Sequence, residues 1–337
     1  MVPARPAAPV RRAAPARREP VIRVRTLCPS ERTRDVVAIL QDEPGATHVV
    51  VLPGAAVEPA GDLVEADVAR EAVEGVVDAL RRLGIGDEGA IELSGLETVI
   101  SRSADRAEEA APGEGADAVV WHELLARTGQ EARLTVTFTI MLTIACLLGA
   151  VGVVTDSPVT VVGAMVLGPE YGPLAALAVA VVRRRRGLAR EAATALVVGF
   201  AVALLVTTAA AALGRATGAV TETALQDLTQ TAFVYQVGPI SVLVALLAGV
   251  AGMVALLAGA GTGVLVGVFI SVTTVPAAGF AAVAVVLGAW PQALGSLAQL
   301  AVNVVGIVVA GLVVLLVAGR RGRAAAARRG ARKPHTA

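Results

Sequence analysis

The sequence predicts an α-helical polytopic membrane domain of six transmembrane helices, preceded by a small α+β soluble domain of the ferredoxin-like kind. Two observations predict it. Hydrophobic residues make up 55% of the 337, and they concentrate after position 133. Charged residues instead dominate the first 130 positions and the last 20, so the net charge of +1 averages two unlike halves.

The N-terminal segment, residues 1–20, is rich in proline, alanine and arginine and has no apolar core. It is predicted to be a disordered basic tail and not a secretory signal. No aromatic residue is interleaved with its arginines, so a passive tail is favoured over one that binds anionic lipid or nucleic acid. Cys28 and Cys146 fall in different halves, which predicts neither a structural disulfide nor a zinc site.

Residues 21–95 are predicted to form a ferredoxin-like cytoplasmic domain with the order strand, helix, strand, strand, helix, strand. The expected elements are Val21–Leu27, a helix after Pro29 capped by Ser30, His48–Leu52 closed by Pro53-Gly54, Leu63–Ala69, Arg70–Leu83 and Ala90–Leu93. This architecture serves sensing, metal carriage and oligomerisation alike, so it does not name a function. The segment shows no metal-binding pair, phosphate loop or catalytic constellation, and His48 is interpreted as an unreactive strand residue. We therefore interpret residues 21–95 as a regulatory or assembly domain.

Residues 96–133 are predicted to contain a linker and a juxtamembrane helix. The linker, up to position 118, is small, acidic and glycine-containing. The helix carries Trp121, Leu124 and Leu125 on one side. Trp121 could anchor at lipid headgroups or pack against the soluble domain, and the sequence leaves both open.

Residues 134–318 contain six segments long enough to span a membrane: 134–154, 158–182, 190–213, 239–259, 262–287 and 294–318. Arg183–Arg186 follows the second segment, and the basic tail, residues 319–337, follows the sixth. With both termini in the cytoplasm, every arginine-rich stretch becomes cytoplasmic, as expected of a multi-pass protein of the bacterial inner membrane.

The second segment contains Gly168-Pro169-Glu170-Tyr171-Gly172-Pro173. Gly168, Pro169, Gly172 and Pro173 should break the helix, and a charged carboxylate at membrane depth costs about 3 kcal/mol or more. Lipid rarely tolerates either feature, so this stretch should face protein or water.

The fifth segment repeats this pattern weakly, with Pro276 as its helix break. Each broken segment is the middle member of a group of three, and three is an odd number, so the second group would insert upside down. A 3+3 inverted repeat with paired broken helices is the pattern of secondary transporters and some channels. Chance remains the competing explanation, because the similarity is short and of low complexity.

The candidate residues for binding a solute or ion are Glu170, Tyr171, Thr273, Thr274 and Asn303. Glu170 is either a protonated acid bonded to freed backbone groups or a cation ligand or proton-coupling group. Tyr171 shares that bond or lies near an interface. The two threonines line the second break or bond their own preceding carbonyl groups. Asn303 lines the site or bonds across helices.

The sequence also resembles the domain-of-unknown-function 389 family over roughly residues 20 to 318. The resemblance rests on Val120–Leu125, Gly149–Gly152, Val162–Met165, Gly168-Pro169 to Gly172-Pro173, Leu265–Val268 with Pro276, and Asn303–Ile307. It implies a bacterial or archaeal membrane protein of the uncharacterised hydrophobic domain kind, with no established activity. The family usually has Leu-Met where Glu170-Tyr171 stands, and a second proline where Val275 stands, so the carboxylate is particular to this chain.

These observations favour a transporter or channel-like protein for a small solute or ion, with a cytoplasmic regulatory domain. The alternative is a membrane sensor or assembly scaffold whose soluble domain binds a ligand or partner. An enzyme is not expected, because the membrane segments offer no histidine and, apart from Glu191 at the edge of the third segment, a single acid. No metal or other cofactor is expected. The lipid bilayer is the expected partner, nucleic acid is not, and a homo-oligomer is left open.

Overall fold

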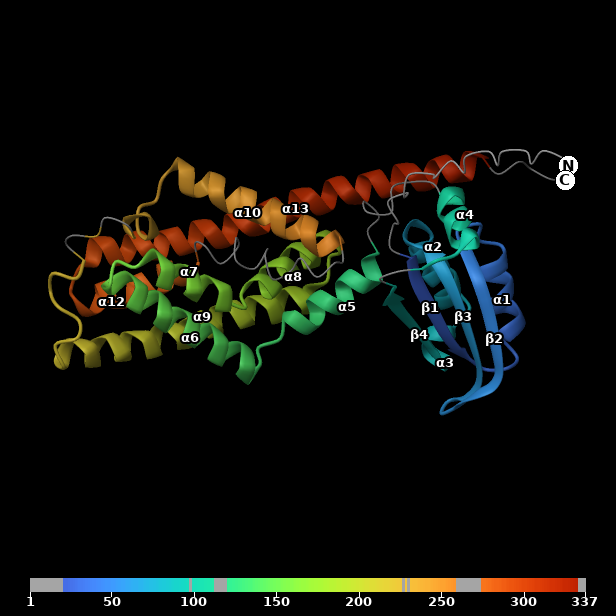
Figure 1. The fold of residues 1–337 in the computed structure, drawn as a ribbon, viewed down its shortest axis with the longest axis horizontal. Coiled ribbons are helices and arrows are strands. Elements are labelled where there is room, and N and C mark those ends of the chain that lie inside the picture. Colours follow the sequence, from blue (N-terminus) through green and yellow to red (C-terminus); the bar gives the residue numbers. More distant parts are fainter. Residues whose placement is uncertain are drawn as a thin grey trace, which may run out of the picture. The chain divides into compact units, whose positions relative to one another are not determined.

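A computed structural model describes residues 21–96, 99–111, 120–225, 228, 231–258 and 274–332 (Figure 1). The chain divides into two compact units, residues 1–120 and residues 121–337.

The first unit contains a four-stranded antiparallel sheet with the strand order β2-β3-β1-β4. Its elements are β1 (Val21–Cys28), α1 (Thr33–Gln41), β2 (Ala46–Val57), β3 (Ala60–Ala69), α2 (Arg70–Arg82), α3 (Ile85–Glu88), β4 (Ala90–Gly95) and α4 (Arg102–Ala110). The predicted strands and helices are therefore confirmed in kind and order. The short helices α3 and α4 were not predicted.

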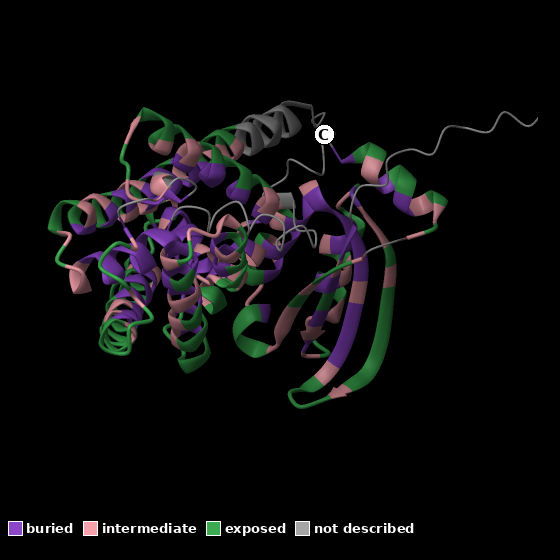
Figure 2. Cartoon of the chain, turned by 60° about the vertical axis from the view of Figure 1, so that its left-hand side comes forward, coloured by how far each residue is buried: buried purple, intermediate pink, exposed green. Residues whose placement is uncertain are grey.

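The core of this unit lies between the sheet and helices α1 and α2. Val24 of β1 and Val64 of β3 are fully buried, as are Val36 of α1 and Leu80 of α2. Residues two apart on a strand share a face, so the alternating pattern of β1 directs one set of side chains to the helices. Figure 2 shows this buried face in purple.

Two local expectations for this unit were wrong. Strand β2 does not close at Pro53-Gly54 but continues to Val57. Ser30 does not cap α1, because Arg32 holds the N-cap position and the Ser30 hydroxyl donates to Asp62 at 2.8 Å. The Ser30 side chain is directed instead to the buried carboxylate of Asp62, and a hydrogen bond to a charged acceptor is stronger than one between neutral groups.

The second unit is helical. Its elements are α5 (Trp121–Glu131), α6 (Val136–Val154), α7 (Pro158–Leu167), α8 (Tyr171–Val182), α9 (Arg186–Ala216), the 3-10 turn η2 (Ala232–Val234), α10 (Pro239–Ala258), α12 (Val275–Val286) and α13 (Trp290–Arg332). Within the described residues, four helices are long and apolar enough to cross a membrane: α6, α9, α10 and α13. The bent pair α7 and α8 would make a fifth span.

The predicted fifth segment, 262–287, is described only as α12, a helix of 12 residues. Its earlier part lies outside the described residues. Six spans and the inverted repeat therefore stay predictions, whereas several membrane-length helices are established.

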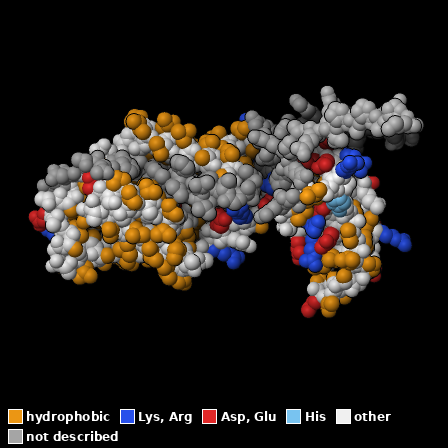
Figure 3. Space-filling view, viewed as in Figure 1, with side chains coloured by type: hydrophobic (Ala, Val, Ile, Leu, Met, Phe, Trp, Pro, Cys, Tyr) orange, Lys and Arg blue, Asp and Glu red, His pale blue; other side chains and the backbone are white. Residues whose placement is uncertain are grey.

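Helix α12 forms the centre of the second unit, against α6, α9 and α13. Its residues from Val275 to Ala284 are all buried, as expected of a helix that is apolar all round. Outward-facing side chains are also apolar, including Leu205 (72% exposed) and Ile240 (77% exposed). Figure 3 shows such side chains, in orange, spread over the surface of this unit. A continuous apolar surface indicates contact with lipid.

Close packing of α6 on α12 depends on glycine. A Cβ atom at Gly279 would lie 2.6 Å from the backbone nitrogen of Ala150, and one at Gly149 would lie 3.3 Å from the Cα of Pro276. The two backbones therefore approach each other where neither carries a side chain, as is common between membrane helices. This contact holds the start of α12 against α6.

Candidate functional site at the helix break

The break between α7 and α8 spans three residues and bends the pair by 53°. Gly168 ends α7 in an extended conformation (φ −68°, ψ 120°). The residue before a proline is excluded from helical geometry, and Pro169 has no N–H to continue the helical hydrogen bonds. The next helix starts at Tyr171, and Pro173 is tolerated there because it lies in the first turn. The predicted helix break is confirmed.

Glu170 occupies the N-cap position of α8 and is 0% exposed. Its Oε1 atom accepts a hydrogen bond from the hydroxyl of Thr274, which is also fully buried. Thr274 is in turn the N-cap residue of α12. The carboxylate thus lies beside two helix N-termini, where the backbone N–H groups favour negative charge.

The surroundings of the carboxylate are tightly packed. A Cβ atom at Gly168 would collide with Oε2 of Glu170 and would lie 2.9 Å from Cγ2 of Val275. The buried Cys146, on α6, belongs to the same core cluster as Leu174 of α8 and Val275 of α12. Helices α6, α7, α8 and α12 therefore all contribute to the site.

Tyr171 turns towards α5 instead of sharing the bond of Glu170. Its hydroxyl is buried and has no hydrogen-bond partner among the described residues. The charges of Glu131 and Arg127 on α5 act on it. Gly172 lies against the same helix, since a Cβ atom there would lie 2.6 Å from the Cβ of Glu131.

The other end of α5 contacts the other end of α8. The guanidinium group of Arg183 lies 5.0 Å from the ring centre of Trp121, in a cation–π contact. Trp121 is thus engaged with the end of the second predicted span. The juxtamembrane helix packs along α8 from Trp121 to Glu131.

Asn303 lies on α13 and is fully buried. Its Oδ1 atom accepts a hydrogen bond from Gln299, one turn earlier, at 3.2 Å. Ser296 and Gln299 are also buried, so a polar stripe follows one side of this apolar helix. Sequence reasoning singled out Asn303 alone, although the spacing of three and four residues could have revealed all three.

The structure thus joins two of the five predicted site residues, Glu170 and Thr274. Pro276 lies in the first turn of α12, at its N-terminus. Thr273 lies outside the described residues. Chemically, a buried carboxylate that accepts from a hydroxyl can hold a proton or a small cation, whereas it would repel an anion.

The comparisons with known proteins bear on this same segment. No curated protein and no solved structure that was compared with the chain matches it. A family model described as "Domain of unknown function (DUF389)" matches residues 165–309, which include Glu170, Thr274 and Asn303. The match confirms the predicted resemblance for this segment and does not extend to the first unit or to α6. Over residues 165–309, which contain the helix break, α8 and α12, the chain is similar to the DUF389 family.

Proposed function

We propose that this chain is a transporter or channel-like membrane protein for a small ion or solute, with Glu170 as the group that binds a proton or a small cation. The observation that carries the proposal is the carboxylate of Glu170, fully buried at a broken apolar helix and bonded to the N-cap hydroxyl of a second apolar helix. Broken helices whose N-termini meet at a buried polar group are typical of transporter sites.

Two opposing effects act on the charge of Glu170. Burial among apolar helices favours the neutral acid, whereas the Thr274 hydroxyl and two helix N-termini favour the carboxylate. No basic residue occurs in α7, α8 or α12 to fix the charged state. A group balanced in this way can gain or lose a proton, or exchange it for a cation, as a site that releases its ligand must.

The remaining parts of the proposal rest on patterns in the amino-acid sequence. Six spans, arranged as an inverted repeat with both termini in the cytoplasm of a bacterial cell, would place the break between two halves that can move against each other. The strand order of the first unit is the one expected of a ferredoxin-like domain, which we assign a regulatory role.

The test is flux in proteoliposomes that contain the full chain and a pH-sensitive dye, with sodium or potassium gradients imposed in turn. We expect Glu170→Gln to abolish proton-coupled or cation flux, because it cannot ionise. The matched control is Glu191→Gln, which changes an exposed carboxylate on α9 of the same unit and should leave flux intact. Flux that survives Glu170→Gln would refute the role of Glu170. No flux from the unaltered protein would favour the sensor or scaffold.

A further inference from the structure

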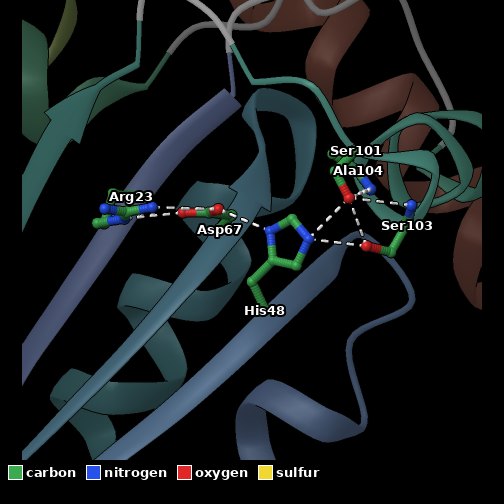
Figure 4. Close-up of polar contacts among 6 residues, drawn as sticks. All are labelled: Arg23, His48, Asp67, Ser101, Ser103 and Ala104. Atoms are coloured by element: carbon green, nitrogen blue, oxygen red, sulfur yellow. Dashed lines mark hydrogen bonds and ion pairs between the residues drawn. The ribbon is translucent and has the colours of Figure 1, made fainter.

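The first unit contains a chain of polar contacts that the membrane site does not use. Asp67, on β3, is only 3% exposed and accepts two hydrogen bonds from Arg23 of β1, at 2.9 and 3.3 Å. Nδ1 of His48 lies 2.8 Å from the same carboxylate. On the other side of the ring, Nε2 lies 2.8 Å from the hydroxyl of Ser101 and 2.7 Å from that of Ser103 (Figure 4).

Backbone geometry sets this arrangement. Arg23 and Asp67 are direct partners across β1 and β3, so their side chains share a face of the sheet. The pairing of β2 with β3 shifts between Thr47 and Val50, and His48 there has a positive φ of 51°. Such an irregularity re-aims a side chain, and here it turns the ring of His48 towards Asp67. Non-glycine residues with positive φ are uncommon and cluster at functional sites.

The positions of the protons follow from Asp67. Burial opposes its charge, but hydrogen bonds and charges from Arg23 and His48 outweigh burial and hold the pKa of Asp67 below its ordinary value. Asp67 is therefore a carboxylate, and Nδ1 of His48 donates to it. In the neutral ring, Nε2 is then left as an acceptor for a serine hydroxyl. A serine, a histidine and a buried aspartate in this order are the parts of a nucleophilic relay.

Of the two serines, Ser101 is the better placed nucleophile. It is the N-cap residue of α4, and its Oγ atom accepts from the backbone nitrogens of Ser103 (3.2 Å) and Ala104 (3.5 Å). These donors stabilise negative charge that develops on Oγ as its proton leaves. The Oγ atom of Ser103 lies 2.7 Å from the Oγ atom of Ser101, so a hydrogen bond between the two hydroxyl groups holds Ser101 in place. The His48 side chain is 36% exposed, so a substrate can reach the cluster from solvent.

We propose that Ser101, His48 and Asp67 form a site that hydrolyses small carboxylic esters. The Oγ atom of Ser101 attacks the ester carbonyl carbon while its proton moves to Nε2 of His48. The bond from that carbon to the alcohol oxygen breaks, and the alcohol leaves with the proton from Nε2. Water then attacks the acyl-serine, giving a proton to Nε2 that returns to Oγ as the carboxylic acid leaves. This departs from the expectation that the domain has no catalytic constellation.

The test uses the full chain in detergent, a fluorophosphonate probe that modifies activated serines, and p-nitrophenyl acetate as substrate. We expect the probe to modify Ser101, as mapped by mass spectrometry of peptides. His48→Gln should slow labelling and ester hydrolysis by at least about 100-fold, the usual contribution of a general base. The control is Ser30→Ala, which changes a serine bonded to another buried aspartate, Asp62, without a histidine and should leave the rate unchanged.

Asp67 acts through His48 and does not touch the substrate. Its test therefore needs a measurement that would not change if Asp67 only stabilised the fold. The readout is the profile of labelling rate against pH in the unaltered protein. Asp67→Asn should flatten that profile, because its amide can donate to Nδ1 and leave the proton on Nε2. Circular dichroism distinguishes this result from unfolding. The proposal is overturned if native protein labels no faster than heat-denatured protein, if the probe modifies another serine, or if His48→Gln labels normally.

Discussion

The buried carboxylates of Asp67, in the first unit, and Glu170, in the second, are compensated in different ways. Asp67 is 3% exposed and has both an arginine and a histidine as partners. Glu170 is 0% exposed and is bonded to a neutral hydroxyl beside two helix N-termini, in helices without basic residues. A fixed cation holds Asp67 in the charged form. Glu170 instead has a neutral hydroxyl and two helix N-termini beside it, so a proton or a cation that arrives can change its charge.

Removing Asp67 should have the largest effect on stability. Asp67→Ala takes the acceptor from Arg23 and His48, and we expect the free energy of unfolding of the first unit to fall by about 3 kcal/mol. Hydrogen exchange of the β1 and β3 amides in the full chain measures this. Glu92→Ala, which removes an exposed partner of Arg25, should cost less than about 1 kcal/mol. Equal losses of stability in Asp67→Ala and Glu92→Ala would mean that burial does not determine how much these ion pairs contribute to the free energy of unfolding.

The second largest effect on stability is expected from adding one methyl group beside Glu170. Gly168→Ala places a Cβ atom against the carboxylate and Val275, and we expect a loss of about 2 kcal/mol in the stability of the second unit. Thermal unfolding in detergent should show a drop of about 4–8 °C. Gly163→Ala, on the same broken pair, is the control, because nothing lies within 4 Å of its Cβ position. An unchanged unfolding temperature in Gly168→Ala would contradict the close contact of Gly168 with the carboxylate.

Removing the hydroxyl of Thr274 should have a smaller effect. Thr274→Val keeps the volume but takes a donor from Glu170, with an expected loss of about 1 kcal/mol. Thr207→Val is the matched control, because Thr207 is fully buried and its hydroxyl has no hydrogen-bond partner among the described residues. In Glu170→Leu, which has no acceptor, the cost of Thr274→Val should shrink, and a double-mutant cycle on unfolding temperatures measures that change. Strictly additive effects would argue against the bond.

Lowering the pH should gradually reduce the free energy of unfolding of the first unit. The pKa values of Asp67 and Asp62 are both lowered in the folded state, that of Asp62 by hydrogen bonds from Thr33, Gly54 and Ser30. Their stabilisation is present above the ordinary aspartate pKa of about 3.9 and is lost as the pH falls through the folded-state values. Urea unfolding of the first unit from pH 6 to pH 3 should show the loss. Asp67→Asn should flatten this dependence only in part, since Asp62 remains.

Local patterns in the sequence predicted most of the secondary structure of both units. The break at Gly168-Pro169 was predictable because its cause is covalent: the proline ring excludes helix on both sides. The end of β2 was not, because an edge strand tolerates a proline that a central strand would exclude. Strand β2 is such an edge, so Pro53 did not end it.

Tertiary pairing was the harder part. Glu170 meets Thr274 across 104 positions, and only the proline and glycine echo indicated that these segments belong together. His48 meets Ser101 across 53 positions, through a bulge and a helix cap that leave no sequence pattern. His48 was therefore interpreted as an unreactive strand residue. A histidine between two polar partners can be recognised only once the register of the strands is known.

Helix α5 lies along α8, with Trp121 beneath Arg183 at one end and Glu131 against Gly172 at the other. The contact at Gly172 leaves no room for a side chain, so the two helices are coupled mechanically at the residue next but one to Glu170. Any change in the packing of α5 would therefore be felt at the first turn of α8, which begins directly after Glu170. The helix that precedes the first apolar span thus supports the break itself.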